Sequence, residues 1–359
     1  MGVSTPALPS VEYDDINPGM GTLNKEPKSK VTSKRGIHFN PGDVLFGKLR
    51  PYLKNWLFAC FEGVAVGDFW VLTSSKIDHG FTYSLIQAPE FQYIANLSSG
   101  SKMHRSDWGL ISNARTFIPT NLSEQKSISS VLFGLDTAIT LHEEKKCQLE
   151  RIKSALLQKM FADKSGYPSV RYKGFDEMWE YCKLEEVFVE RNQKEVADAN
   201  YPLCSFIAHK GVVPKDKYDR SFLVKSDGKK YKRTEINDFI YSSNNLETGS
   251  IGLNKFGRAT ISPVYSIFMV KGDSDFIAGL ASTPQFIYEM IRFRQGVVYG
   301  QWRIHESDFL KIKYYIPQVT EQEKIGNLLS KLTHAIILHE RKLKLLSRVK
   351  QSLLQKMFI

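Results

Sequence analysis

The residues of this chain that could do chemistry are clustered in short basic loops. Residues 47–55 read Gly-Lys-Leu-Arg-Pro-Tyr-Leu-Lys-Asn and follow a hydrophobic run that predicts a β-strand. Lysine can bind a phosphate, and arginine can form paired hydrogen bonds with a guanine edge. Lys48, Arg50, Tyr52 and Lys54 are therefore candidate contacts to nucleic acid. A surface turn whose cations are merely solvated is the alternative interpretation.

A second basic cluster occurs once in each half of the chain. Lys102 and Arg105 belong to the first copy, and Gln301 and Arg303 belong to its counterpart. Glutamine and arginine can form paired hydrogen bonds with adenine and guanine, respectively. Exposed residues at a strand edge are the alternative interpretation.

Two further basic loops lie in the second half. Lys255 and Arg258 belong to a loop that we expect to occupy the place that residues 47–55 hold in the first half, before a strand at residues 262–265. Lys210 opens another basic loop, which we interpret mainly as a solvated surface while keeping Lys210 as a candidate DNA contact.

Catalytic motifs are missing. Residues 42–49 match the first seven positions of a phosphate-binding loop, but Leu49 stands where that motif needs a Ser or Thr for magnesium. The sequence has no Asn-Pro-Pro-aromatic motif of an amino-methyltransferase, no nucleophile elbow and no zinc-ligand spacing. We therefore predict no catalytic residue and no metal ligand in this chain.

Two long helices must position these loops, and they repeat each other. Residues 128–161 and 325–358 carry related text at an offset of 197, and both copies end in Leu-Leu-Gln-Lys-Met-Phe. Prolines precede both copies, and Ser123 and Thr320 are the predicted N-caps. An internal repeat of this length predicts two domains, each followed by a helix.

Hydrophobic residues recur in both helices at alternating steps of four and three, which is a heptad seam. Neither helix can bury this seam alone, so we predict that the two pair as a coiled coil. The seam comprises Ile128, Leu132, Leu135, Ile139, His142, Leu149, Leu156 and Met160 in the first helix, and Ile325, Leu329, Leu332, Ile336, His339, Leu343, Leu346, Leu353 and Met357 in the second.

His142 and His339 are polar members of this seam. We interpret them as residues that set the register of the helix pair, as a buried Asn does in a coiled coil. A pH switch or a pair of metal ligands is the alternative.

A mixed region with strand-like and helix-like segments precedes each helix. Residues 44–46, 69–72, 116–118 and 266–270 read as strands, and Pro89 and Pro284 mark matching helix starts. The expected fold is therefore α+β with a pseudo-twofold internal repeat. We place the first mixed domain at residues 1–118, its helix at 119–161, a linker and second mixed domain at 162–317, and the second helix at 318–359.

Composition limits the partners and the compartment. The 359 residues carry a net charge of +11, which suits a polyanion such as nucleic acid, although a basic protein without that partner has the same total. The four cysteines have no paired spacing, as expected in a reducing compartment. No apolar run is long enough to span a bilayer, and no signal pattern is present, so we expect a cytoplasmic protein.

These features together resemble the specificity (S) subunit of type I restriction–modification systems. The resemblance rests on the two helix texts, on Leu-Phe-Gly-Lys-Leu-Arg-Pro-Tyr-Leu at residues 45–53, and on the linker at residues 167–175 that runs on to Trp179 and Leu184. It implies two target-recognition domains that each read half of a split double-stranded DNA sequence. It also implies an antiparallel helix pair that sets the distance between the half-sites.

The resemblance further implies the partners. Two methyltransferase subunits dock on the helices and use S-adenosylmethionine to methylate adenine at N6. A restriction subunit, a motor-nuclease that uses ATP and magnesium, joins them to cleave DNA. The specificity subunit itself does no chemistry, in agreement with the missing catalytic motifs.

The first half departs from the second at its start. In the second half 39 residues separate Phe161 from Tyr201, whereas seven precede the matching Leu8, so about 30 residues have no counterpart. We expect the first domain either to be truncated or to be completed by another segment.

Two other classes of function are compatible with the sequence. One is a stand-alone DNA-modifying enzyme, either a nuclease or a methyltransferase. The other is a protein adaptor whose domains never contact DNA.

Overall fold

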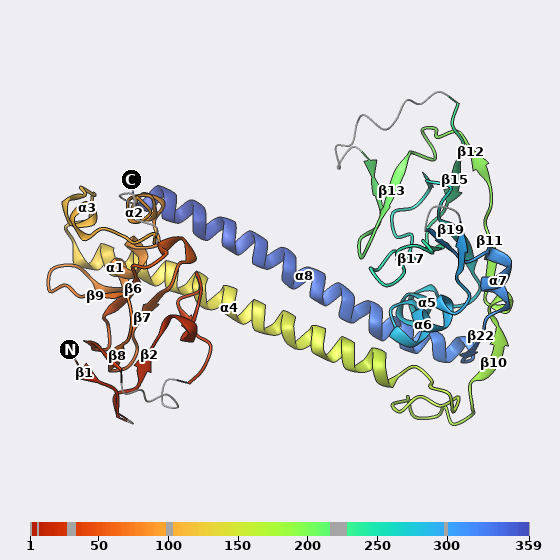
Figure 1. Cartoon of the computed structure of the whole chain (residues 1–359), viewed down its shortest axis with the longest axis horizontal. Helices are drawn as coiled ribbons and strands as arrows, with labels where there is room; N and C mark the ends of the chain where they lie inside the picture. The colour runs from red at the N-terminus through yellow and green to blue at the C-terminus, as the bar shows by residue number, and fades with distance from the viewer. Residues whose placement is uncertain are drawn as a thin grey trace. The chain divides into compact units, whose positions relative to one another are not determined.

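The computed structural model describes residues 2–5, 7–26, 34–97, 103–215, 228–297 and 301–358. Lys102 lies outside these ranges. The chain divides into two compact units, unit 1 (Met1–Lys146 and Leu338–Ile359) and unit 2 (Cys147–Ile337). The described residues form eight α-helices and several β-sheets, which confirms the predicted mixture of helix and strand (Figure 1). No helix among them is long and apolar enough to cross a bilayer.

Unit 1 contains two main sheets. One has the order β1-β5-β8-β2 and the other has the order β7-β6-β9. Their strands are β1 (Gly2–Val3), β2 (Ser10–Val11), β5 (Arg35–Phe39), β6 (Val44–Gly47), β7 (Trp56–Phe58), β8 (Gly63–Ala65) and β9 (Phe69–Leu72), and a small ribbon joins β3 (Ile16–Asn17) to β4 (Thr22–Leu23).

The core of unit 1 forms around β6, whose four residues are all buried. Val44 and Phe46 on this strand pack against Tyr83 from helix α1 (His79–Leu85). Helices α2 (Pro89–Ala95) and α3 (Trp108–Asn113) complete the unit. Strands of alternating or wholly apolar residues are expected to bury in this way.

The described part of unit 2 contains more β-strands than that of unit 1. Its largest sheet has the order β11-β19-β16-β17. Its elements are β10 (Glu180–Lys183), β11 (Phe188–Glu190), β12 (Lys194–Glu195), β13 (Cys204–Ile207), β14 (Gly211–Pro214), β15 (Tyr231–Thr234), β16 (Phe239–Tyr241), β17 (Ile251–Leu253), β18 (Ala259–Ile261), β19 (Ser266–Val270), α5 (Ser274–Ala281), α6 (Pro284–Ile291), β20 (Gln295–Val297), β21 (Gln301–Arg303), α7 (Glu306–Lys311) and β22 (Lys313–Ile316).

The two long helices are α4 (Leu122–Lys159) and α8 (Val319–Met357). Both begin within the predicted segments but before the predicted N-caps, so Ser123 and Thr320 are not N-caps and lie in the first turns. At α4 the side chain of Asn121 accepts a hydrogen bond from the backbone N–H of Ser123, at 2.8 Å, and thus takes the capping role.

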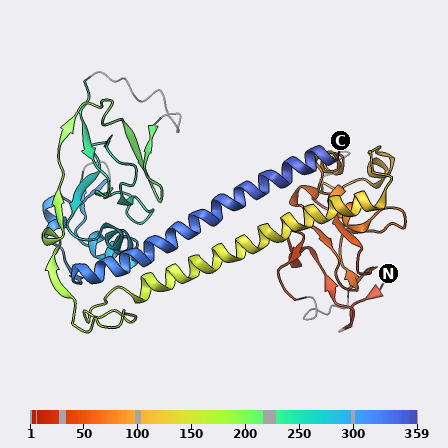
Figure 2. The ribbon, with the colours of Figure 1, turned by 180° about the vertical axis from the view of Figure 1, so that it is seen from behind.

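Within unit 1 the stretches of α4 and α8 contact each other. Leu132 on α4 shares a hydrophobic cluster with Leu354 on α8. Further along α4, the two Nδ1 atoms of His142 and His339 lie 2.9 Å apart. As residue numbers rise on α4 they fall on α8, so these two stretches are antiparallel (Figure 2).

Every predicted seam residue on both helices is buried or half-buried. In unit 2, Met160, which directly follows α4, lies in the same core as Ile325 and Leu329 from α8. A continuous coiled coil along both helices and a pseudo-twofold relation between the halves remain predictions.

Two predicted strands are wrong. Residues 116–118 form no strand, and Phe117 is 85% exposed. Residues 262–265 form a turn between β18 and β19, closed by a hydrogen bond from the N–H of Tyr265 to the carbonyl oxygen of Ser262. Local β-propensity does not make a strand where no neighbouring strand is available to pair with it.

Candidate nucleic-acid interface

The loop between β6 and β7 projects the first set of candidate residues. A short 3₁₀ turn (Pro51–Leu53) lies at its tip, and it is flanked by Arg50 and Lys54 with φ angles of 51° and 58°. Both angles are left-handed, which is uncommon for residues with a side chain and costs about 1–2 kcal/mol each. Pro51 is buried, whereas Arg50, Tyr52 and Lys54 are exposed.

Hydrogen bonds hold this loop against a neighbouring segment of unit 1. The backbone N–H of Arg50 donates to the carbonyl oxygen of His104 at 2.8 Å, and Leu49 forms a β-bridge with Arg105. The rings of Tyr52 and His104 lie 5.9 Å apart. The strained backbone is thus fixed from outside, as is typical of functional loops.

Asp68 organises the base of the loop. Its carboxylate pairs with Arg105 at 2.8 Å and with Lys48 at 3.9 Å. The hydroxyl of Tyr13 donates to the carbonyl oxygen of Asp68 at 2.5 Å and accepts from the N–H of Leu49 at 3.1 Å. Burial raises the pKa of Tyr13 to about 12, so this hydroxyl stays protonated at neutral pH.

Five candidate residues are thereby brought together in what we call the unit 1 basic patch: Lys48, Arg50, Tyr52, Lys54 and Arg105. Asp68 partly neutralises two of its cations. No carboxylate among the described residues pairs with Arg50 or Lys54, so these two are the cations best placed to meet a phosphate or a base.

In unit 2 the structure corrects the predicted correspondence between loops. The hairpin equivalent to β6–β7 is β16–β17, so the counterpart of residues 48–55 is the loop at residues 242–250. That loop contains neither Lys nor Arg. Lys255 and Arg258 instead lie between β17 and β18. Strand pairing, which sequence spacing does not reveal, decides the correspondence.

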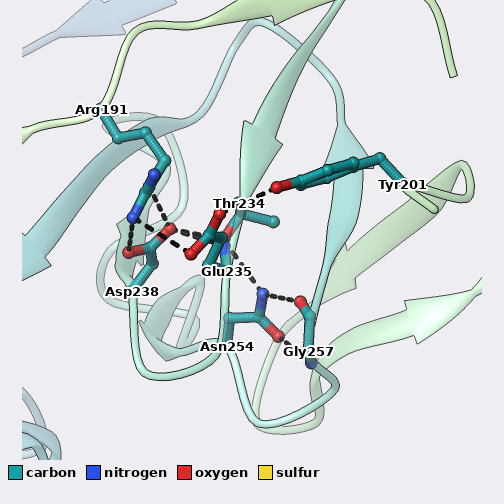
Figure 3. A network of polar contacts seen from close by, with 7 residues as sticks. All are labelled: Arg191, Tyr201, Thr234, Glu235, Asp238, Asn254 and Gly257. Atoms are coloured by element: carbon teal, nitrogen blue, oxygen red, sulfur yellow. Dashed lines mark hydrogen bonds and ion pairs between the residues drawn. The ribbon is translucent and has the colours of Figure 1, made fainter.

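A buried polar network fixes the backbone of the Lys255 loop (Figure 3). The side chain of Asn254, which is fully buried, accepts from the N–H groups of Phe256 and Gly257 and donates to the carbonyl oxygen of Gly257. It also donates to the hydroxyl of Thr234, at 3.1 Å. A satisfied network of this kind specifies one loop conformation.

The same network extends to an ion pair beneath the loop. Thr234 donates to Asp238 at 3.2 Å, and Asp238 pairs with Arg191 at 2.7 Å. Burial raises the pKa of Asp238, and the hydrogen bonds and the charge of Arg191 oppose that rise. Tyr201 donates to Glu235 at 2.8 Å, which places its ring beside the loop.

Both candidate cations of this loop, Lys255 and Arg258, already contact other side chains. Lys255 pairs with Asp275 and also donates to Asn237, each at 2.8 Å. The guanidinium carbon of Arg258 lies 5.9 Å from the centroid of the Tyr201 ring, a cation–π distance. Contact with DNA through Lys255 therefore requires it to exchange or share its carboxylate partner.

Lys210 and Lys255 line one cavity of about 500 Å³ in unit 2. Lys153 from α4 and His334 from α8 line it as well. Burial lowers the pKa of Lys153. Lys153 and His334 were not predicted as binding candidates, because helical periodicity places Lys153 in the heptad seam and His334 on the helix surface and says nothing of the loops that meet them.

The remaining candidates lie on β21, which pairs with β20. Arg303 is exposed and its guanidinium lies 3.6 Å from the carboxylate of Glu306. The backbone N–H of the neighbouring Trp302 donates to the side chain of Asn244, in the β16–β17 loop, at 2.6 Å. Gln301 is described only as a strand residue. The candidates of unit 2 thus belong to several separate features, unlike those of unit 1.

The structure also singles out two glutamines that the site prediction overlooked. In unit 1 the side chain of Gln125 accepts from the N–H of Asp78 at 2.8 Å and donates to the carbonyl oxygen of Pro119 at 2.7 Å. In unit 2 Gln322 makes the same pair of bonds to Asp273 and Pro317, at 3.2 and 2.9 Å. Both glutamines lie at the same position of the repeated helix start, so the repeat in the sequence could have identified them.

Among the described residues, no group of three or more His, Cys, Asp or Glu side chains could hold a metal ion.

Comparison with known proteins adds information on the fold. No family model matches the sequence, and neither does any curated protein. The S subunit of a type I restriction–modification system from M. genitalium matches with a TM-score of 0.63 at 14% identity, covering 99% of this chain and 90% of that chain. This chain has the fold of a type I restriction–modification S subunit.

Two further solved structures match with lower scores. The HsdS subunit from Thermoanaerobacter tengcongensis has a TM-score of 0.45 at 15% identity, covering 98% of this chain and 92% of that one. A chain from a study of complex assembly and conformational transition in a type I R-M system has a TM-score of 0.47 at 14% identity, covering 99% of this chain and 94% of that one.

Proposed function

We propose that this chain is the non-catalytic specificity subunit of a type I restriction–modification complex and reads a bipartite target in double-stranded DNA. The observation that carries the proposal is the fold, which matches an S subunit over 99% of the chain. One fold can serve several functions. The exposed cations and the net charge of +11 therefore provide the necessary second support.

Each unit reads one half of the target in this proposal. In unit 1, Arg50 and Lys54 lie on a loop whose left-handed backbone is held by a hydrogen bond to the carbonyl oxygen of His104 and by the buried Pro51. A rigid loop that presents Arg, Lys and Tyr can place base contacts and phosphate contacts at once. In unit 2, the cavity lined by Lys210 and Lys255 is the candidate site for contact with the other half of the target.

The long helices set the distance between the half-sites. We infer that α4 and α8 pair as an antiparallel coiled coil along their whole lengths and relate two halves of one repeat. Support comes from the antiparallel contacts in unit 1 and from the matching glutamine bridges at the two helix starts.

In this proposal, partner subunits carry out the catalytic reactions. Two methyltransferase subunits would supply S-adenosylmethionine-dependent methylation, and a restriction subunit would supply ATP- and magnesium-dependent cleavage. Both helices carry exposed apolar residues that fit such docking, because solvent-facing apolar residues on a helix favour a partner surface. In the described residues they are Leu122, Val131, Leu141 and Ile152 on α4, and Val319, Ile337, Leu338, Leu345 and Val349 on α8.

Gel-shift titrations of the chain assembled with its methyltransferase test the proposal. Affinity for the target should exceed that for scrambled duplexes, and it should fall steeply as salt rises. Arg50→Ala should relax preference at one half-site by about 1–3 kcal/mol if Arg50 contacts a base. Lys76→Ala changes an exposed cation outside the patch, and it is the matched control.

Two results would contradict the proposal. An assembled complex without sequence preference would leave only an adaptor role. Methyl transfer or cutting by the purified chain alone, given S-adenosylmethionine and magnesium, would favour a stand-alone enzyme. Methylome sequencing of cells that carry the system would report both half-sites and their separation together.

A further inference from the structure

In unit 2 the cavity of about 500 Å³ brings side chains of both long helices together with two loops. Lys153 comes from α4 and His334 comes from α8. Lys210 comes from the tip of the β13–β14 hairpin, and Lys255 comes from the loop that follows β17. Residues far apart in the sequence thus line one concave site within a single compact unit.

The charged side chains that line this cavity are mostly basic. Three of them are lysines, and the single carboxylate among the lining residues is that of Asp275. This carboxylate already pairs with Lys255 at 2.8 Å. The lining therefore carries an excess of positive charge, which favours an anionic ligand.

Lys153 gains most from an anionic ligand. Its side chain is half-buried, and no carboxylate in the described part of the chain pairs with it. Burial lowers the pKa of Lys153, and no described neighbouring charge opposes that shift. An ammonium group that leaves water without a counter-ion is unfavourable, so a bound anion would stabilise its charged form.

The hairpin that presents Lys210 is held in one conformation. His209, which also lines the cavity, has a φ angle of 59°, which is uncommon for a residue with a side chain. Its N–H donates to the carbonyl oxygen of Gly249 at 3.3 Å, and the N–H of Lys210 donates to that of Ile207 at 3.0 Å. A Cβ added at Gly249 would lie 2.2 Å from the ring of His209, so the two residues are in close contact. A fixed, strained tip beside a cavity is typical of binding sites.

The walls of the cavity are largely apolar. They include Phe206 and Leu329, which are 6% and 3% exposed, together with Ile251. Polar groups that converge within apolar walls are typical of small-molecule sites, whose volumes are about 300–1,000 Å³. Such a space admits a phosphate group or a small phosphate ester. A duplex, whose major groove alone is about 12 Å wide, could insert only a backbone phosphate.

We propose that this cavity is a phosphate-binding site in which Lys153, Lys210 and His334 hold the phosphate oxygens. Lysine binds phosphate as a point charge, and an imidazole N–H can donate to a phosphate oxygen. Lys255, which shares its charge with Asp275, adds attraction. The phosphate belongs either to the backbone of DNA or to a free phosphorylated small molecule. In the first case the inference rests on the proposed function, and in the second it goes beyond it.

The test measures binding of the full chain to adenosine monophosphate (AMP) and to a short DNA duplex. Lys153→Met should weaken AMP binding at least about tenfold, because a charge-assisted hydrogen bond is lost. For the duplex it should lower the slope of log affinity against log salt by about one. Lys159→Met, at an exposed site on the same helix, is the matched control and should change neither value. Thermal denaturation checks that both variants fold.

Acylation of lysines, mapped by mass spectrometry, reports occupancy at the site itself. Protection of Lys153 but not Lys159 by AMP, with no competition from the duplex, supports a free phosphate ester. Protection by the duplex, or displacement of AMP by it, supports a phosphate of the DNA backbone.

The inference is overturned if neither ligand protects Lys153 at millimolar concentration. It is also overturned if Lys153→Met binds both ligands as the unchanged chain does. Sequence preference of the assembled complex is measured separately by gel shift. Preference without occupancy of the cavity would remove only this inference, whereas AMP binding without sequence preference would remove only the proposed function.

Discussion

At the scale of single residues, one buried carboxamide joins each long helix to the domain that precedes it. Gln125 is 2% exposed and bridges a loop N–H to a carbonyl oxygen, and Gln322, at 4% exposure, repeats the bridge in unit 2. A side chain that satisfies two buried backbone groups fixes the direction in which the helix leaves its domain, because both groups are costly to leave unpaired.

Replacing Gln125 by Ala should destabilise unit 1 by about 2–3 kcal/mol, since the N–H of Asp78 and the carbonyl of Pro119 lose their partner. Urea denaturation followed by hydrogen exchange in unit 1 measures this change. Gln148→Ala, at an exposed site on the same helix, should stay within about 0.5 kcal/mol. Equal costs for the two variants would show that the bridge is unimportant.

Substitutions at Arg50 test whether the backbone of the loop is left-handed at this residue. Because its φ angle is 51°, Arg50→Gly should be more stable than Arg50→Ala by about 1 kcal/mol. Tyr52 is exposed and has no positive φ, so the order should reverse there, with Gly less stable than Ala by about 0.5–1 kcal/mol. Thermal denaturation of the four variants gives both differences. The same order at both positions would exclude the strained turn.

At the scale of elements, a polar pair interrupts the apolar contacts between α4 and α8 in unit 1. Only one of two imidazoles joined through Nδ1 atoms can donate the shared proton, so His142 and His339 must not both be charged. Desolvation, then the charge of Lys342 and the proximity of His339, lower the pKa of His142. The interpretation of this pair as a register setter stays a prediction, with proton sensitivity as its consequence.

The pair should make unit 1 less stable as pH falls. The folded-state pKa of His142 lies below its ordinary value of 6.5, so the unfolded chain binds more protons in that window. The contribution is complete above pH 6.5 and is lost as pH falls toward the folded-state pKa. Urea denaturation at pH 8 and pH 5 should show this loss, and His142→Asn should reduce it. An unchanged pH dependence in the variant would refute the role of the pair.

At the scale of the whole molecule, the proposal is that two readers share one helical spacer. Inserting seven residues into α4 and seven into α8 at facing positions keeps the seam in register and lengthens both helices by about 10 Å. The spacing between half-sites should then widen by about three base pairs, at about 3.4 Å per base pair. Methylome sequencing reports the new spacing. Replacing one heptad in each helix without changing the length is the control, and an unaltered spacer in the lengthened complex would exclude the ruler.

The sequence by itself determined the features that depend on neighbours along the chain. The helical repeat, the burial of its seam, and the basic loop after a buried strand all follow from periodicity and short motifs, and the structure places each of them close to where it was expected. Five of the candidate contacts in unit 1 come together because they lie on one hairpin loop and on the segment that pairs with it.

Only the tertiary structure decided which distant segments meet. Strand pairing assigned the β16–β17 loop, and not the Lys255 loop, as the counterpart of the Arg50 loop. Pairing with β10 makes a strand of Lys313–Ile316, while the similar residues 116–118 stay exposed without it. The meeting of Lys153 and His334 with Lys210 likewise depends on packing between separate elements. A strand or a pocket is completed by partners remote in sequence, and local propensity carries no record of them.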